Sequence, residues 1–440
     1  MPGIIGKDGR TSAIERCFRE SVRLAGKDPI KLSDWKNEEP SKAKQNVLRK
    51  AREEKPDFVI IGPEGPLAEG VVDALQAIGI PCIGPTKVLA QLESSKAFTR
   101  ELVAKHGIPG NPEYRIFREF DMEGIAKYLK EIDQYVIKPD GLTGGKGVKI
   151  SNAHLFSIPD AIEYCRELFS NRHPAVIIEE KLDGEEFSLQ SFCDGTHVVH
   201  MPVVQDHKRV GEGDTGPNTG GMGSYSCVNH SLPFLLPHHL RQAQAINEAV
   251  ARALLKETHE KYKGILYGGF MVTREGIRLL EYNARFGDPE TLNVLSLLKT
   301  DFIDICEAII EEKLHELPIV FEDSATVCKY VVPEGYPDNP LRNRRIDVTN
   351  VPKESEKLRI YYAAVEERDG KCYLTGSRAI AFVGIGKDLS EAQAIAEEAA
   401  CAVQGPVIHR KDIGTYELIE QRIAHMRSFH ADALGKATCV

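Results

Sequence analysis

The chain has 440 residues, of which 42% are hydrophobic and 28% charged, and its formal net charge is −9. At roughly 150 residues per domain, this length predicts about three domains, and the composition is typical of a globular protein. The acidic balance argues against sequence-independent binding to nucleic acid. The longest apolar runs, at 58–61 and 379–383, are far below the ~20 residues that a membrane-spanning helix needs. We therefore expect small-molecule partners, with neither nucleic acid nor a membrane among them.

The ten cysteines are scattered along the chain without a C-x-x-C pair. This spacing is typical of a reducing compartment, in which cysteines serve as small apolar side chains rather than as a disulfide framework. Residues 1–10 lack the basic segment followed by an apolar stretch that marks a signal peptide. These features predict a cytoplasmic enzyme, and the expected oligomeric state is a monomer or a homodimer.

Strand and helix patterns alternate in residues 1–90, which predicts a parallel α/β domain. The expected elements are a strand at 4–5, a helix through residue 22, a strand at 58–62, a helix at 67–77 and a strand at 81–84. The charged region 28–44 shows no recognisable pattern. A ligand crevice is expected at the carboxyl ends of the strands, where Gly6 and the turn at 62–66 fall.

Residues 91–324 are expected to form a second, larger domain, and residues 325–440 a smaller α+β domain. The central region shows strand patterns at 135–139, 147–150 and 176–180, a helix at 159–169, paired strands within 187–204, a long helix at 240–258 and a hairpin of strands 269–273 and 277–283. The last region shows short strands and one helix at 390–402. The chain is thus predicted to be an α/β and α+β multidomain protein.

The segment 136–148 reads V-I-K-P-D-G-L-T-G-G-K-G-V. A strand delivers Lys138 into a loop whose glycines allow several backbone N–H groups to point into one anion-binding concavity. Lys138 and Lys146 add positive charge, which suits a polyphosphate. An ordinary glycine-rich hairpin loop is the alternative, and the spacing is not that of a Walker A loop.

Two further segments carry acidic residues. In 177–187, a strand ends in a linker whose backbone suits an adenine edge, with Leu182 as an apolar wall and Glu186 near the ribose; a solvated acidic turn is the alternative. In 277–290, strand alternation places Leu279, Glu281 and Asn283 on one face, with Leu280 and Tyr282 on the other. Glu281 and Asn283 are hard oxygen ligands, which suit Mg²⁺ shared with phosphates; a polar edge strand is the alternative.

The segment 205–224 is rich in glycine and poor in apolar residues, so it cannot pack as core. It is expected either to be disordered or to become ordered around a ligand. Lys208 and Arg209 are candidate partners for a carboxylate or phosphate, and Asp206 or Asp214 for an ammonium group.

Together with 57–99, these four segments resemble the phosphoribosylamine–glycine ligase (glycinamide ribonucleotide synthetase) family of the ATP-grasp superfamily. The most specific strings are Q-D-H-K-R at 205–209, G-P-N-T-G-G-M-G at 216–223 and R-F-G-D-P-E at 285–290. The resemblance implies an N-terminal substrate-binding domain at 1–90, an ATP-grasp domain at 91–324 with a lid at about 120–190, and a C-terminal domain at 325–440. It also implies ATP-dependent joining of glycine to 5-phosphoribosylamine in purine biosynthesis, through a glycyl phosphate.

The resemblance implies a role for each candidate site residue. ATP would contact Lys96, Lys138, Gly141, Gly144, Gly145, Lys146, Gly147, Glu179, Leu182 and Glu186. The metal, Mg²⁺ or Mn²⁺, would be held by Glu281 and Asn283. The catalytic candidates are Arg285, Lys138 and Asp214. Glycine and 5-phosphoribosylamine would contact Gly9, Arg10, Thr11, Ser12, Glu64, Lys208, Arg209, Asn218, Gly220, Gly221 and Asp288.

The N-terminal loop departs from the family pattern G-x-G-G-R-E-H-A. Gly6, Gly9 and Arg10 keep part of it, whereas Thr11 and Ser12 replace Glu-His, and the later A-P-G-N string is absent. Thr11 and Ser12 are still able to donate to a phosphate at a helix N-terminus. The alternatives are an ATP-grasp ligase that uses a different amine, a non-catalytic nucleotide sensor, and a nicotinamide-dependent oxidoreductase.

Overall fold

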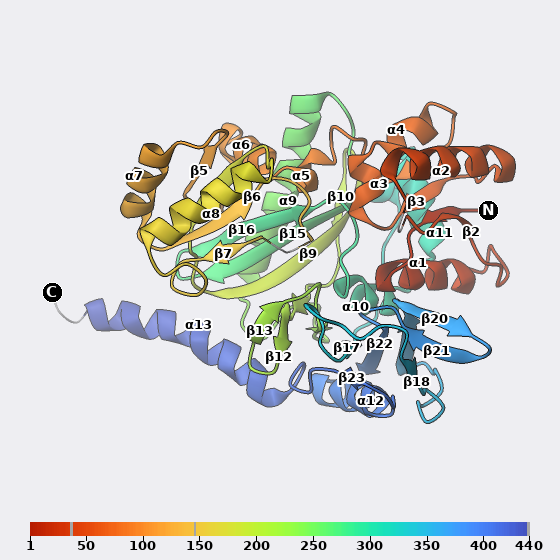
Figure 1. The fold of residues 1–440 in the computed structure, drawn as a ribbon. Coiled ribbons are helices and arrows are strands. Elements are labelled where there is room, and N and C mark those ends of the chain that lie inside the picture. The colour runs from red at the N-terminus through yellow and green to blue at the C-terminus, as the bar shows by residue number, and fades with distance from the viewer. Residues whose placement is uncertain (36–37, 145–146, 438–440) are drawn as a thin grey trace.

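The computed structural model describes residues 1–35, 38–144 and 147–437, with side chains through Phe429. Its elements form an N-terminal domain, a central domain that carries a lid, and a C-terminal domain followed by a long helix (Figure 1). The lid helices lie on the far side of the central domain from the N-terminal domain. Within the described residues, every helix is too short or too polar to cross a membrane.

The N-terminal domain is the predicted parallel α/β unit, with strand order β2-β1-β3-β4. Its elements are β1 (Gly3–Ile5), α1 (Gly9–Glu20), β2 (Ile30–Ser33), α2 (Pro40–Glu54), β3 (Val59–Ile61), α3 (Glu64–Ala68), α4 (Val71–Gln76) and β4 (Cys82–Ile83). The single helix predicted at 67–77 is wrong, because Gly70 has φ of 68° and separates α3 from α4. The unrecognised region 28–44 contains β2 and the start of α2, which Glu39 caps.

The lid is an antiparallel sheet of order β5-β8-β6-β7 with two helices on one face, and it has a hydrophobic core of its own. Its elements are β5 (Tyr114–Phe117), α7 (Met122–Ile132), β6 (Tyr135–Pro139), β7 (Lys149–Ile150), α8 (Ile158–Ser170) and β8 (Val176–Glu180). β6 and β8 have the bounds that the sequence predicted, whereas β7 is shorter than expected.

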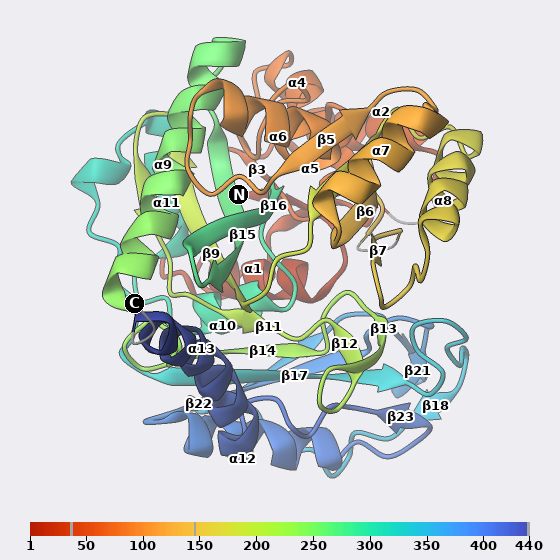
Figure 2. The ribbon, with the colours of Figure 1, turned by 90° about the vertical axis from the view of Figure 1, so that its left-hand side faces the viewer.

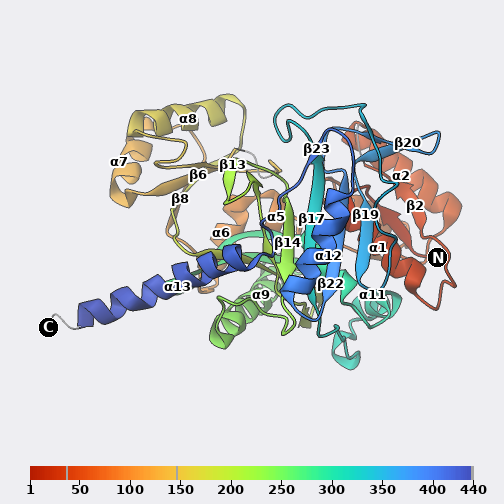
Figure 3. The same ribbon diagram turned by 90° about the horizontal axis from the view of Figure 1, so that it is seen from below.

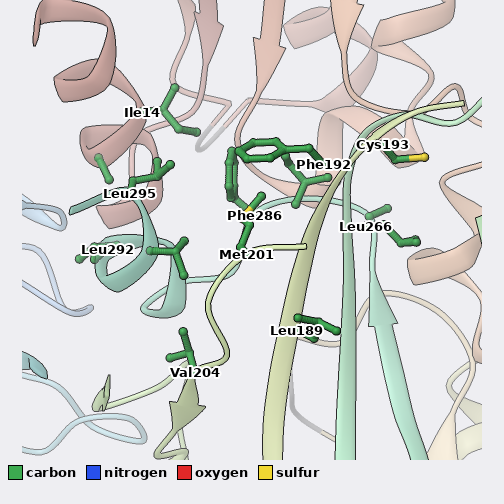
Figure 4. Close-up of a cluster of buried hydrophobic side chains, with 14 of the residues drawn as sticks. Ile14, Leu189, Phe192, Cys193, Met201, Val204, Leu266, Phe286, Leu292 and Leu295 are labelled. Atoms are coloured by element: carbon green, nitrogen blue, oxygen red, sulfur yellow. The ribbon is translucent and has the colours of Figure 1, made fainter. Parts of the chain in front are cut away.

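The rest of the central domain is built on a four-stranded sheet of order β10-β9-β15-β16. Its strands are β9 (Glu185–Asp194), β10 (Val198–His200), β15 (Lys263–Thr273) and β16 (Gly276–Asn283), and its helices are α5 (Gln91–Ser94), α6 (Lys96–Lys105), α9 (Pro237–Thr258), α10 (Glu290–Ser296), α11 (Phe302–Glu311) and the 3₁₀ turn η1 (Leu314–Glu316). Phe192 of β9 packs edge-on against Phe286, with 6.3 Å between ring centroids, and Ile14 of α1 lies in the same cluster (Figure 4). A shared core therefore fixes the N-terminal domain against this sheet.

The C-terminal domain contains a sheet of order β11-β14-β17-β22-β19, with β23 on β17, and a small sheet of order β18-β21-β20. Its elements are β17 (Ala325–Pro333), β18 (Arg345–Ile346), β19 (Leu358–Tyr362), β20 (Val365–Arg368), β21 (Lys371–Leu374), β22 (Ile380–Gly386), α12 (Leu389–Cys401), β23 (Val407–Ile408) and α13 (Tyr416–Ala437). Figure 2 shows this sheet below the β9–β15 sheet.

The glycine-rich segment is ordered by pairing within this structure. It forms β11 (Gln205–Asp206), β12 (Arg209–Gly211), β13 (Thr215–Asn218) and β14 (Gly223–Ser226). β14 pairs with β17 over four residues, so the segment joins the C-terminal sheet. The expectations that the segment is disordered or ordered by a ligand, and that it cannot pack as core, are therefore wrong: its backbone pairs within the sheet, and Met222 is buried in the hydrophobic core.

Candidate functional site

A pocket lies where β9, β15 and β16 meet the Asp206–Lys208 segment. It is lined by Glu186, Phe187, Ser188, Asp206, Lys208, Tyr267, Gly269, Leu280 and Glu281. The Lys208 ammonium lies 3.7 Å from a carboxylate oxygen of Glu186 and 3.7 Å from one of Glu281, so it bridges two walls of the pocket. Four residues that the sequence singled out (Asp206, Lys208, Glu186 and Glu281) thus line one cavity.

A β-bulge sets the direction of Glu281. Gly269 pairs with Glu281, but the next residue, Phe270, pairs with Leu279, so Leu280 has no direct partner. The predicted alternation is therefore wrong: Leu279 is buried on the core side, whereas Leu280 lines the pocket with Glu281. Such an extra residue re-aims the side chains that follow it, which is a common use of bulges beside active sites.

Glu281 and Asn283 follow the bulge two residues apart on β16. Burial raises the pKa of the Glu281 carboxyl, but Lys208, Lys138 and Lys96 outweigh it and hold the pKa below its usual value. Asn283 Oδ1 accepts a hydrogen bond of 3.1 Å from Arg285. An ionised carboxylate and an amide oxygen are hard oxygen donors, a set that fits a divalent ion shared with phosphates.

Lys138 on β6 is paired with a buried carboxylate. Its ammonium lies 2.6 Å from Glu179 Oε2 and donates to the carbonyl of Leu280 at 3.3 Å. Arg100 on α6 donates to both oxygens of Glu179, at 2.7 and 3.0 Å. Burial raises the pKa of Glu179, but the two cations outweigh it and lower the pKa to about 2. Glu179 is therefore the counter-ion of Lys138, and its predicted contact with adenine stays a prediction.

Lys96, at the start of α6, reaches the glycine-rich loop of the lid. Its ammonium donates to the carbonyl of Gly141 at 2.9 Å. Burial lowers the pKa of Lys96, a shift that Glu281 opposes and Lys138 reinforces. Gly141, Gly144 and Gly147 have φ of 108°, 59° and 82°, a backbone region that favours glycine. The predicted residues Gly145 and Lys146 lie outside the described residues.

The linker between β8 and β9 carries the predicted adenine and ribose contacts. Leu182 is half-buried in it, and Glu186 is exposed at the pocket rim. The N–H of Glu180 and that of Lys181 donate to the carbonyls of Glu113 and Gln134. These two groups are thus engaged, and the roles of Leu182 and Glu186 stay predictions.

Arg285 lies between two acidic residues, Glu93, whose side chain is almost buried, and the half-buried Glu64. Its Nη2 is 3.0 Å from Glu93 Oε1 and its Nε is 3.4 Å from Glu64 Oε2. Burial lowers the pKa of Arg285, but Glu93 and Glu64 outweigh it and raise the pKa above its usual value. Arg10 Nη2 lies 3.8 Å from the same Glu64 oxygen, and Arg10 also donates to the carbonyl of Phe286 at 2.9 Å. The predicted residues Arg10, Glu64 and Arg285 are therefore brought together, whereas Glu93 was not predicted.

The N-terminus of α1 is already capped. Asp8 accepts hydrogen bonds from the Thr11 N–H at 2.9 Å and the Thr11 hydroxyl at 2.6 Å. The hydroxyl of Ser12 donates to the carbonyl of Tyr362 in the C-terminal domain at 2.7 Å. Both hydroxyls are thus engaged within the protein, and their predicted contacts with a substrate phosphate stay predictions.

A second group of predicted residues meets the C-terminal domain. Tyr330 donates to Asp288 Oδ1 at 2.7 Å. A Cβ on Gly9 would lie 1.8 Å from the Tyr330 hydroxyl oxygen, so only glycine fits at position 9.

Arg378 donates to the carbonyls of Gly220 and Gly221 and lies 3.4 Å from Asp288 Oδ2. Asn218 pairs with Arg209 across β12 and β13. Tyr330 and Arg378 have no local sequence signal, because their partners come from distant parts of the chain.

The two candidate ammonium acceptors differ in their surroundings. Asp206 lines the pocket, and its Oδ1 is buried without a hydrogen-bond partner among the described residues. Burial and the neighbouring Glu290 raise the pKa of Asp206. Asp214 instead accepts from Arg410 at 2.7 Å and from Arg422, and although burial opposes them, these cations lower its pKa to about 2. Asp206 is thus the residue that faces the pocket, and the predicted catalytic role of Asp214 stays a prediction.

Two other groups combine residue types that bind metals. Asp194 lies near His197 and His315, and Glu397 lies near Cys401 and His409. Asp194 accepts from the N–H groups of Thr196, His197 and Leu314, and Glu397 is paired with the buried Lys329 at 2.6 Å. Both carboxylates are therefore already satisfied by the protein.

Three family models match consecutive parts of the chain. They describe the phosphoribosylglycinamide synthetase N domain at 3–93, its ATP-grasp (A) domain at 94–291 and its C domain at 326–416. Among curated relatives, the phosphoribosylamine–glycine ligase of Methanocaldococcus jannaschii is 46% identical over 96% of this chain and 98% of its own length. That of Methanocella arvoryzae is 48% identical over 86% of each chain.

Solved structures show the same arrangement. The crystal structure of phosphoribosylamine–glycine ligase from Thermotoga maritima has a TM-score of 0.76 and 28% identity, and the match covers 93% of this chain and 99% of that one. A biotin carboxylase from Campylobacter jejuni, with a TM-score of 0.71 and 14% identity over 97% of this chain and 95% of its own, shares the fold.

Proposed function

Because the chain belongs to the phosphoribosylglycinamide synthetase family, we propose that it joins glycine to 5-phosphoribosylamine and releases glycinamide ribonucleotide, ADP and phosphate. The observation that carries this proposal is the pocket in which Lys208 bridges Glu186 and Glu281 beside Lys138 and Lys96. The match of the N domain supports 5-phosphoribosylamine as the amine and does not favour a ligase for another amine.

The chemistry follows from the poor reactivity of a carboxylate toward amines. An oxygen of the glycine carboxylate attacks the γ-phosphorus of ATP, and ADP leaves. The amine nitrogen of 5-phosphoribosylamine then attacks the glycyl carbon, the bond to the phosphate oxygen breaks, and the nitrogen loses a proton. Such transfers depend mainly on positioning and charge neutralisation, so no protein nucleophile is required.

The cationic groups are well placed to hold ATP phosphates. Lys138 lies on the strand that leads into the glycine-rich lid loop, and Lys96 donates to the Gly141 carbonyl of that loop. Both lysines act on the Glu281 carboxylate, and together they would neutralise a polyphosphate. Leu182 would contact the adenine and Glu186 the ribose. Glu281 and Asn283 would hold Mg²⁺ or Mn²⁺, and a bound ion neutralises charge on the phosphates and orients them.

We assign the glycine ammonium to Asp206. Its buried, unpaired oxygen lies in the same pocket as Glu281, and a cation there would relieve its repulsion with Glu290. Lys208 would neutralise the glycine carboxylate while it is phosphorylated, and Arg285 the phosphate that leaves. The strands at 205–226 would keep water from the acyl phosphate, which hydrolysis would destroy.

5-Phosphoribosylamine would then lie where the N-terminal domain meets the other two. Arg10, Glu64 and Arg285 form one side of that junction, and Gly9, Asp288, Gly220 and Gly221 form the other. Asn218 and Arg209 would contribute substrate contacts from the β12–β13 hairpin.

We propose that the enzyme acts in the cytoplasm, as a monomer or homodimer; the scattered free cysteines support a reducing compartment.

An assay with purified protein tests the proposal. ADP should be released only when glycine, 5-phosphoribosylamine and ATP with Mg²⁺ are all present, and mass spectrometry should detect glycinamide ribonucleotide. The matched controls omit each substrate in turn and replace 5-phosphoribosylamine by an unrelated primary amine. Equal ADP release with the unrelated amine would instead favour a ligase for a different amine.

A further inference from the structure

The long helix α13 lies beyond the part of the chain that the family's C domain matches, which ends at residue 416. It leaves the C-terminal domain and extends along the central domain toward the side of the lid (Figures 1 and 3). Leu418, Ile419 and Met426 are buried along it, and it packs against β9. The helix is therefore anchored to the sheet that carries the pocket.

Arg422 of α13 bridges two segments that are distant in sequence. Its Nε lies 3.3 Å from Glu185 Oε2, at the start of β9, and its Nη2 donates to Asp214, in the turn between β12 and β13. One turn along the helix, His425 Nδ1 lies 2.7 Å from the other oxygen of Glu185. Glu185 is 4% exposed, so these contacts lie largely out of water.

Arg410 closes the network from the C-terminal domain. It donates to Asp214 Oδ1 at 2.7 Å, to both oxygens of Asp412, and to the carbonyl of Arg209 at 3.2 Å. Asp412 in turn accepts from the N–H of Gly213 at 2.9 Å. The side chain of Arg410 is 1% exposed, and its charge is balanced by these carboxylates. The network thus fixes the backbone on both sides of the β12–β13 turn.

The anchored residues are immediate neighbours of the pocket residues. Glu185, held by Arg422, precedes Glu186, and Arg209, held by Arg410, follows Lys208. Glu186 and Lys208 face each other across the pocket at 3.7 Å. A shift of either anchored segment would therefore change the separation of the two groups that we assign to ribose and substrate.

We propose that Arg422 is a positioning residue, through which α13 holds the β8–β9 linker and the β12–β13 hairpin at the spacing that the nucleotide site requires. This inference rests on the proposed function for the assignment of Glu186 to ATP. It predicts that loss of the Arg422 bridge weakens nucleotide binding although Arg422 does not itself contact the nucleotide.

The test compares Arg422→Ala, Arg422→Lys and the control Arg427→Ala, which removes the same charge from an exposed position of the same helix. Each variant is measured for folding by circular dichroism, for the Kd of ADP with Mg²⁺, and for the KM of ATP and kcat of the ligase. We expect Arg422→Ala to raise Kd and KM about tenfold while kcat changes less than threefold. Lysine keeps the charge but not the two-pronged geometry, so it should restore part of the affinity.

Kd and KM within twofold of wild type in a folded Arg422→Ala protein would overturn the proposal, as would an equal change in Arg427→Ala. If Arg422→Ala does not fold, Arg422→Lys decides in the same way: a raised Kd supports positioning and an unchanged Kd overturns it. The ADP titration needs no ligase turnover, so a wild-type protein that binds ADP but makes no glycinamide ribonucleotide would refute the proposed function alone.

Discussion

The Lys138 ammonium and the Glu179 carboxylate lie 2.6 Å apart on the neighbouring strands β6 and β8 of the lid. Glu179 is also held by two hydrogen bonds from Arg100, which lies on α6 outside the lid. Arg100 donates further to the carbonyls of Leu279 and Leu280 on β16. One buried carboxylate thus connects the lid, α6 and the strand that carries Glu281, so Lys138, the lysine that we assign to the ATP phosphates, is oriented by the same contacts that hold the lid.

This arrangement predicts different outcomes for the two cations. Lys138→Ala should raise the KM of ATP at least tenfold and lower the melting temperature only slightly, because Arg100 still neutralises Glu179. Arg100→Ala should cost about 3–5 kcal/mol of unfolding free energy, since it breaks a buried network. Urea unfolding and ATP kinetics on both variants check this. A Lys138→Ala protein that unfolds, or one with wild-type KM, would show that Lys138 has another role.

Glu281→Ala should strongly reduce turnover, because it removes the ionised oxygen ligand that we assign to Mg²⁺. We expect kcat to fall by about 10²–10³, the order found when one charge-stabilising group is removed from an active site. The control is Glu275→Ala, which removes an exposed carboxylate in the turn of the same hairpin. This variant should keep full activity. ADP release as a function of Mg²⁺ concentration measures the effect, and a variant with the turnover and the Mg²⁺ dependence of the wild type would refute the assignment.

The sequence predicted the three domains and most chemical segments, because glycine-rich loops, paired carboxylates and strand patterns are local signals. The parallel N-terminal sheet and the lid strands β6 and β8 were predicted. Lys208 and Glu281 were each singled out as site candidates, whereas their contact in one pocket was not predicted. The family comparisons confirm the ligase family, the three-domain architecture and the ATP-grasp fold.

Long-range contacts could not be predicted from one sequence. The bulge at Leu280 interrupts the alternation that placed Leu279 beside Glu281, and a bulge shows only in the register of two strands. Arg100 lies in an ordinary helix pattern, and its partner Glu179 is far along the chain. Likewise, β14 joins the C-terminal sheet because its backbone pairs with β17 and because Met222 and Tyr225 are buried in the core, and the composition of the glycine-rich segment signals neither contact.

The assignment of glycine to Asp206 predicts a selective loss. Asp206→Asn keeps the shape of the side chain but removes the negative charge, so the KM of glycine should rise about 30-fold or more while the KM of ATP changes less than twofold. Glu212→Gln, an exposed neutralisation in the same glycine-rich segment, is the matched control and should leave both KM values unchanged. Equal KM values for glycine in wild type and Asp206→Asn would move the ammonium site elsewhere.

His207 should make the protein less stable in mild acid. Its ring is 2% exposed, and neither ring nitrogen has a hydrogen-bond partner among the described residues. Burial, together with the charge of Arg410, lowers the pKa of His207 to about 3. In the unfolded chain an imidazole has a pKa of about 6.5, so below that pH the unfolded state binds a proton that the folded state does not.

The stability that neutral His207 contributes is therefore present above pH ~6.5 and is lost as the pH falls toward 3, by up to about 1.4 kcal/mol per pH unit. His207→Leu, which stays neutral, should flatten the fall in unfolding free energy between pH 6.5 and 5, where few carboxylates titrate. The control is His238→Leu. Because the ring of His238 is exposed, this substitution should leave the pH slope of the unfolding free energy as in wild type. Urea unfolding at several pH values measures the slopes, and equal slopes for wild type and His207→Leu would mean that His207 is protonated in the folded protein.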